Sequence, residues 1–245
     1  MTRNLKVLGL ALAAMFALTA VAASVASAQQ GTLTSDGPVK LTGSETGAAG
    51  SGANALTAFG LRTECAGSSY TGTKVGSTTE GVPSGAKDAT IVPKYEQKNC
   101  KTFPGEFPTT VDVNNCHYVV HLGETTGGVA GTYGVTFDVV CKNVGEEITV
   151  TVFTNATKHA ENKPFCILHV PQQTGLKGAH ATDTGNGHVD LTGKVEGIKA
   201  VKTNGGEDAL LCAATETNTA SFDIDVTVKG ENAAGEETKV SISHP

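Results

Sequence analysis

The residues with the clearest chemistry in this chain are its six cysteines. Cysteines bind zinc when they come in closely spaced pairs, and in an oxidising compartment they join as disulfides. The closest two, Cys100 and Cys116, stand 16 positions apart, so no C-x2-C zinc pair is present and disulfides are favoured. Six cysteines allow 15 pairings. Among these we expect the sequential set, Cys65–Cys100, Cys116–Cys141 and Cys166–Cys212.

A second candidate for metal chemistry is the pair His117 and His121, with the spacing H-x-x-x-H. On a helix the two rings would be neighbours and could hold zinc. The Tyr-Val-Val run between them favours a strand, where positions i and i+4 lie roughly 13 Å apart. One metal ion does not span that distance. We therefore expect separate strand histidines, with His169 also pointing outward.

Oxygen ligands for calcium are concentrated in the segment from Asp183 to Asp190. Its order departs from the EF-hand loop, and as a glycine-aspartate repeat it occurs only once, whereas that architecture stacks many copies. We expect a hairpin turn there. Asp223 and Asp225 share a strand face with Thr227, and we expect that face to be solvated.

Motifs for nucleophilic catalysis are absent: the chain has no G-x-S-x-G elbow. It has no Trp and only four Tyr, which disfavours an aromatic platform for sugars. A catalytic triad or a carboxylate pair brought together by the fold stays open, because its spacing is set in three dimensions. We assign no catalytic residue, cofactor or metal, and we do not expect an enzyme.

The elements that must position these residues are β-strands, because apolar and polar residues alternate along much of the chain. The alternation is clear in 133–139, 148–152, 189–195 and 222–229, and weaker in 39–43, 56–63, 90–95, 110–114, 116–122, 165–170 and 239–243. Roughly ten to twelve strands predict an all-β, disulfide-bonded domain: an antiparallel β-sandwich or barrel-like domain with Greek-key connections. The Gly-rich and Ser-rich stretches 47–52 and 68–87 are expected to be mobile loops.

Strand phase places the cysteines in the core. Cys116 shares its strand face with Val120, and Cys141 shares its face with Phe137. If the two strands fold back through the loop 123–128, both cysteines reach the same end of a hairpin on its buried side. This hairpin supports the Cys116–Cys141 pairing.

The chain begins with an export signal, in which Arg3 and Lys6 precede an apolar stretch that ends in an A-x-A cleavage site. We expect cleavage between Ala28 and Gln29, an uncleaved anchor helix being the alternative. The expected organisation is a signal peptide at 1–28, a flexible segment with an edge strand at 29–55, and the all-β domain at 56–245, with division into two lobes near 145–160 as an alternative.

The net charge of the mature chain limits the classes of partner that we expect. Of the 18 basic residues the signal removes two, which leaves 16 against 24 acidic residues and a net charge of −8. An acidic surface repels nucleic acid and anionic membrane surfaces. We therefore expect neither as a partner of the mature protein.

Several runs resemble one group of proteins. The segments 89–95, 111–118, 170–176 and 195–198, together with the cysteine frame, are similar to secreted, Thr/Gly-rich proteins of high-GC soil actinobacteria. The likeness covers most of the chain from about Leu56. It implies an exported all-β protein and carries no activity.

Two functional classes follow from the sequence. The favoured one is a secreted, non-catalytic extracellular β module that binds an unknown ligand or cell-surface component, for binding, adhesion or a surface role. The alternative is a secreted hydrolase or small-ligand carrier whose site is built from loops.

Overall fold

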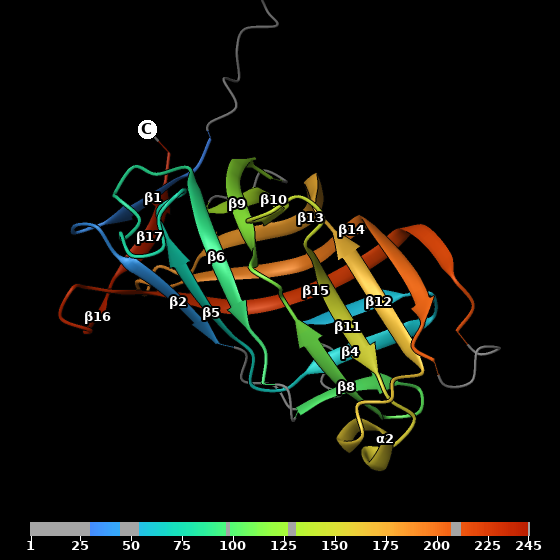
Figure 1. Ribbon diagram of the computed structural model, residues 1–245. Helices are drawn as coiled ribbons and strands as arrows, with labels where there is room; N and C mark the ends of the chain where they lie inside the picture. The colour runs from blue at the N-terminus through green and yellow to red at the C-terminus, as the bar shows by residue number, and fades with distance from the viewer. Residues whose placement is uncertain (1–29, 45–53, 97–98, 127–130, 207–211, 245) are drawn as a thin grey trace, which may run out of the picture.

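The computed structural model (Figure 1) describes residues 30–44, 54–96, 99–126, 131–206 and 212–244. The expected signal peptide, its cleavage site between Ala28 and Gln29, and the expected loop 47–52 lie outside the described residues. Within them the all-β prediction is confirmed, and the one helix, α2, is a single short turn at Ala156–Ala160. No helix in these ranges is long and apolar enough to cross a membrane.

Seventeen strands are described, and every strand pairing is antiparallel. Their bounds are β1 Thr32–Ser35, β2 Lys40–Ser44, β3 Ala55–Ala58, β4 Leu61–Cys65, β5 Ser69–Thr73, β6 Asp88–Lys94, β7 Cys100–Phe103, β8 Phe107–Asp112, β9 Cys116–Thr125, β10 Thr132–Cys141, β11 Glu147–Val152, β12 Cys166–Pro171, β13 Gln173–Asp183, β14 Val189–Asn204, β15 Thr215–Glu231, β16 Glu237–Thr238 and β17 Val240–Ser243.

The long strands β14 and β15 cross the molecule and belong to two closed circuits of paired strands (Figure 1). The first circuit runs β15, β2, β5, β6, β9, β10, β13, β14 and back to β15. The second circuit runs β15, β3, β4, β7, β8, β11, β12, β14 and back to β15. Each circuit therefore has eight strands, of which two are shared.

The order of strands differs from the Greek-key connections expected from the sequence. Within each circuit, neighbouring strands follow one another in chain order, and the chain alternates between the circuits. It adds β3–β4 to the second circuit, β5–β6 to the first, β7–β8 to the second, and continues in this way to β12. Each visit to a circuit therefore adds two antiparallel strands that are consecutive in the chain.

The apolar interior is continuous across the two circuits. Strands β10 and β11 alternate buried and half-buried positions along their whole length, as the period-2 pattern predicted. Their inward side chains, such as Val135 and Val150, belong to one buried cluster that also holds Leu168 and Ile224. This cluster takes residues from both sides of the segment 145–160.

Two short stretches, 68–87 and 56–63, depart from the expected strand map. The stretch 68–87, expected to be a mobile loop, contains β5, and within this stretch Tyr70 and Val82 are buried. The stretch 56–63, expected to be one strand, is a hairpin that turns at Phe59 and Gly60, both with positive φ. The segment 29–55, expected to hold an edge strand, contains β1, at the edge of a two-stranded sheet with β17, and β2, which pairs with both β15 and β5.

One end of the first circuit is covered by a separate two-stranded sheet of β1 and β17. From this sheet Leu33 and Ile242 are buried in the interior cluster. Next to β1, the amide of Gly31 donates a hydrogen bond 2.8 Å long to the carbonyl of Gly123 in β9, which attaches the N-terminal end of this sheet to the first circuit. We call the β1–β17 sheet the cap.

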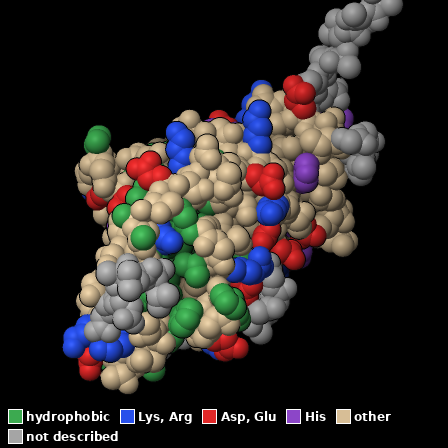
Figure 2. Space-filling model, turned by 90° about the vertical axis from the view of Figure 1, so that its right-hand side faces the viewer, with side chains coloured by type: hydrophobic (Ala, Val, Ile, Leu, Met, Phe, Trp, Pro, Cys, Tyr) green, Lys and Arg blue, Asp and Glu red, His purple; other side chains and the backbone are tan. Residues whose placement is uncertain are grey.

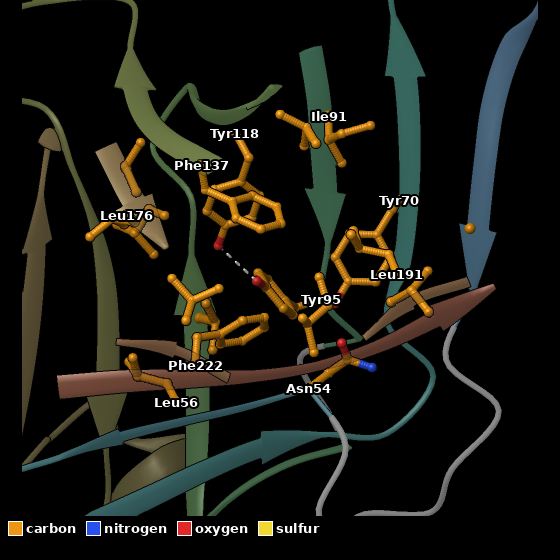
Figure 3. Close-up of a pocket in the computed structure, with 18 of the residues that line it drawn as sticks. Asn54, Leu56, Tyr70, Ile91, Tyr95, Tyr118, Phe137, Leu176, Leu191 and Phe222 are labelled. Carbon is orange, nitrogen blue, oxygen red and sulfur yellow. Dashed lines mark hydrogen bonds between the residues drawn. The ribbon is translucent and has the colours of Figure 1, made fainter. Parts of the chain in front are cut away.

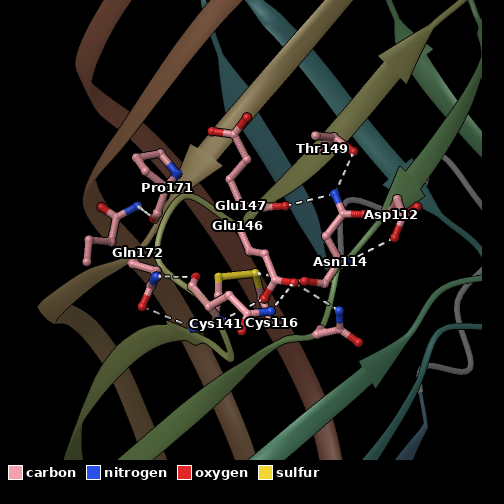
Figure 4. The surroundings of a disulfide bond; sticks show 12 residues. Asp112, Asn114, Cys116, Cys141, Glu146, Glu147, Thr149, Pro171 and Gln172 are labelled. Carbon is pink, nitrogen blue, oxygen red and sulfur yellow. Dashed lines mark hydrogen bonds between the residues drawn. A yellow bond between two sulfur atoms is a disulfide. The ribbon is translucent and has the colours of Figure 1, made fainter.

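Three disulfide bonds, typical of proteins that fold in an oxidising environment, link Cys65 to Cys100, Cys116 to Cys141 and Cys166 to Cys212. These are the pairs expected from the sequence, and Cys116 and Cys141 are register partners on β9 and β10. Around that bond (Figure 4) the side-chain amide of Asn114 donates to the carbonyl of Glu147, 3.0 Å away. The side-chain oxygen of Gln172 accepts from the amide of Cys141 at 3.2 Å, so both strand ends are held.

Candidate functional site

The interior of the molecule contains an apolar cavity where the two circuits meet (Figure 3). The space in which the centre of a water-sized sphere can move is about 100 Å³. An engineered apolar cavity of about 150 Å³ stays dry and binds benzene, so this space is of the order that a small organic molecule needs. Its wall takes Phe137 and Leu176 from the first circuit, Leu56 and Val150 from the second, and Phe222 from the shared β15. We call this space the junction cavity.

Several side chains of this wall are incompletely buried although they face inward. Leu56, Leu191 and Phe222 belong to the half-buried class, while Leu168 in the second circuit is 0% exposed. Close-packed interiors leave few spaces larger than a water molecule. The junction cavity is therefore an apolar space that the side chains of the protein leave unfilled.

The main polar feature of the wall is a pair of phenols. The hydroxyl groups of Tyr95 and Tyr118 lie 3.1 Å apart and point toward one another in Figure 3. Burial raises the pKa of Tyr118, although its hydrogen bond with Tyr95 acts in the opposite direction. The Tyr118 phenol therefore stays protonated at neutral pH, and either hydroxyl of the pair can be the donor in their hydrogen bond.

Two other polar wall residues, Asn54 and Thr63, are held by hydrogen bonds within the protein. The side-chain amide of Asn54 donates to the carbonyl of Asp225 at 3.1 Å. Thr63 begins a buried chain of hydroxyls, with Thr102 at 2.7 Å and Thr109 a further 2.8 Å on. Since Thr109 donates to the carbonyl of Phe107, Thr102 must donate to Thr109 and Thr63 to Thr102.

A second apolar space of about 70 Å³ lies in the first circuit under the cap. Leu33 and Ile242 of the cap line it, as do Ala89 of β6 and Ala181 of β13. Two charged residues also border it. Lys87 donates to the side-chain oxygen of Gln30 and Asp88 bonds His121, both at exposed positions. We call this space the cap cavity.

Comparisons of the chain with protein-family models, with curated proteins and with solved structures gave no match.

The histidines singled out in the sequence lie outside both cavities. His121 bonds Asp88 at 2.8 Å and Asp138 at 3.2 Å through its two ring nitrogens, on the outer side of the first circuit. His169 bonds Glu147 and Thr203 while its neighbours along β12 face the core, as expected. Among the described residues no group of three His, Cys, Asp or Glu is arranged to hold a metal ion.

The aspartates singled out in the sequence have structural roles. Asp183 and Val189 are register partners across the turn that joins β13 to β14, and Gly185 and Gly187 have positive φ, so the segment is a hairpin turn. Asp183 also accepts hydrogen bonds from the amides of Gly185 and Ile242. The side chain of Asp223 pairs with Arg62 at 2.9 Å, and Asp225 is exposed.

Sequence reasoning missed the cavity, yet one signal for it was present. Three of the four tyrosines, Tyr70, Tyr95 and Tyr118, line the junction cavity. Tyr118 is in phase with Cys116 and Val120, which placed its ring on the inward face. A phenol on a core face needs a polar partner, and that need was the readable sign of a polar point inside.

Outside the cavities, hydrophobic side chains also lie together on one face. Figure 2 shows them over the middle of the side that lies on the right in Figure 1, between charged side chains. At the β3–β4 turn Phe59 is half-buried, with the ammonium group of Lys202 lying 5.3 Å from the centre of its ring. Aliphatic and aromatic side chains covered in this way are common on soluble proteins.

Proposed function

We propose that this chain is exported through its signal peptide and acts outside the cell as a non-catalytic protein that binds a small apolar ligand in the junction cavity. The observation that carries the proposal is the cavity itself, an apolar space bounded by strands of both circuits. Ligand sites are typically concave and mostly apolar, with a few polar groups that set orientation. The Tyr95–Tyr118 pair fits that description.

Water gains little in such a space. A buried water is stable when it makes two to four hydrogen bonds, and this wall offers few polar groups besides the tyrosine pair. An apolar ligand loses nothing by leaving water and gains from each area of apolar surface that it buries. Ligand binding is therefore favoured over filling by water.

Hydrolysis would need a nucleophile beside a base, and the described wall of the junction cavity does not offer that pair. The described wall of the junction cavity contains no histidine or carboxylate, and its one cysteine, Cys65, is disulfide-bonded. The histidines that have acidic partners lie on the outside. This arrangement supports a carrier or binding role over the hydrolase alternative.

Fluorescence of the apolar dye N-phenylnaphthylamine tests the proposal on the mature protein. We expect saturable binding with one dye per chain, lost in Leu56→Trp, which fills the junction cavity from β3. Val92→Trp is the matched control, because Val92 is 42% exposed. Leu191→Phe serves as a second filling variant, and circular dichroism checks that each variant is folded.

The proposal fails if folded Leu56→Trp and Leu191→Phe bind the dye as well as the parent protein does. It also fails if the parent protein shows no saturable binding of the dye.

A further inference from the structure

The two cavities adjoin along the axis of the first circuit. Five side chains line both spaces and form the layer between them: Leu41, Ile91, Val120, Leu191 and Val228. Each is aliphatic and comes from a different strand, so the layer is a ring of flexible apolar groups. No described polar side chain separates the cavities.

The junction cavity, the shared layer and the cap cavity form a path whose two ends differ in polarity. Along β9 the inward residues run from Tyr118 at the junction cavity through Val120 in the shared layer to Leu122 at the cap cavity. Four residues of strand cover roughly 13 Å. The path therefore has a hydrogen-bonding end at Tyr118, while its other end is lined by small apolar residues such as Ala89 and Ala181.

We infer that the ligand is an elongated aliphatic molecule with one neutral hydrogen-bonding head, its head at the Tyr95–Tyr118 pair and its chain passing between Ile91 and Leu191 into the cap cavity. This inference rests on the proposed function and adds the shape and direction of the ligand. A compact ligand would use the junction cavity alone, whereas a single alkyl chain has the cross-section to pass an aliphatic layer whose side chains change rotamer.

The contacts around the cap cavity favour the neutral head at the tyrosine pair over a ligand with a charged head at the cap end. Lys87 is the cation that borders the cap cavity, and its ammonium group bonds Gln30 at an exposed position, 2.9 Å away. Asp88, next to it, would repel a carboxylate. A neutral head at the tyrosine pair leaves all of these contacts intact.

Dye displacement by a series of primary alcohols, butanol, hexanol, octanol and decanol, tests the inference. In the parent protein we expect affinity to rise about fourfold for each added methylene, the gain from burying one more apolar group. In Ala89→Leu, which fills the cap cavity, butanol should keep its affinity within twofold, while decanol should fall to the level of hexanol. Val92→Leu, on an exposed position of the same strand, should follow the parent series.

Ala181→Leu fills the cap cavity from β13 and is a second test variant, so that a folding defect specific to Ala89→Leu does not decide the outcome. Equal loss for all four alcohols, or full decanol affinity in both filling variants, would overturn the inference. Either result leaves dye binding in the parent protein, so it is distinguishable from failure of the proposed function, in which neither dye nor alcohol binds.

Discussion

The phenol of Tyr118 on β9 meets the phenol of Tyr95, just beyond the end of β6, at 3.1 Å inside a mostly apolar wall. Tyr118 also faces Val139 across β10 and Ile91 across β6 as register partners. The backbone of three neighbouring segments therefore fixes the position of one polar point. A ligand with a single polar group would be oriented by it.

Removal of the Tyr118 hydroxyl should weaken binding of a polar head selectively. For Tyr118→Phe we expect octanol affinity to fall about 5- to 10-fold, the value of one hydrogen bond, while octane affinity changes less than twofold. Competition against the dye measures both.

The control for this prediction is Tyr133→Phe, because the hydroxyl of Tyr133 bonds His244 at 3.0 Å and its ring does not line the junction cavity. Tyr133→Phe should leave the affinities for octanol and for octane unchanged. Equal losses for octanol and octane in Tyr118→Phe would show that the hydroxyl does not contact the head.

Truncation of leucines should distinguish the cavity wall from the close-packed core. Leu168→Ala, at a fully buried site in the second circuit, should lower the free energy of unfolding by about 3 to 5 kcal/mol. Leu191→Ala should lower the free energy of unfolding by only about 1 to 2 kcal/mol. This half-buried side chain already borders empty space, so its truncation removes fewer contacts. Urea denaturation measures both values, and equal costs would mean that the wall is packed as densely as the core.

The Cys116–Cys141 bond should be a large contributor to stability. It closes a loop of 25 positions, for which chain entropy gives about 3 to 4 kcal/mol, and the paired Cys116→Ala, Cys141→Ala variant should lose about that much. The parent protein unfolded without reductant should show no reactive thiol, and the variant should show none either, since its other two bonds remain. Two or more thiols in the parent would contradict the formation of all three bonds.

The stability of the first circuit should depend on pH through His121. Partial burial disfavours the charged ring, but hydrogen bonds to Asp88 and Asp138 outweigh it and raise the pKa of His121 above its ordinary 6.5. Because the folded-state pKa is raised, the stabilisation is fully present below about pH 6.5 and is lost as pH rises through the folded value. His121→Gln should therefore destabilise the protein more at about pH 5.5 than at about pH 8.5, in urea denaturation at both pH values.

His117, on the same strand, provides the opposite control. Burial alone lowers its pKa, so it opposes folding as pH falls below its unfolded-state value. His117→Gln should thus relieve a loss of stability at low pH. If His121→Gln behaved in the same way as His117→Gln, the Asp88–His121–Asp138 bridge would not form in solution.

Local patterns were readable from the sequence because they depend on neighbouring residues. Alternation predicted β10 and β11, and the phases of Cys116 and Cys141 predicted which face they share across one hairpin. By contrast, β5 was missed because Ser, Gly and Thr dominate it, and its inward Tyr70 faces Gly43 of β2. Pairings such as Leu41 with Gly230 join distant parts of the chain, and no local signal encodes them.

The candidate site was less predictable than the fold. An inward Leu191 that borders a cavity and an inward Leu168 that is fully packed have the same alternating pattern in sequence. Whether opposing side chains meet depends on how the two circuits close through the shared strands β14 and β15. The cavity is thus a property of strand closure and not of any short motif.

A crystal structure of the chain from Gln29 onward, grown with decanol, would locate the ligand. We expect electron density for one decanol, its hydroxyl within hydrogen-bond distance of Tyr95 or Tyr118 and its chain running past Ile91 toward Ala89. Density for ordered water in the cavities, or decanol bound only on the outer surface, would contradict this expectation.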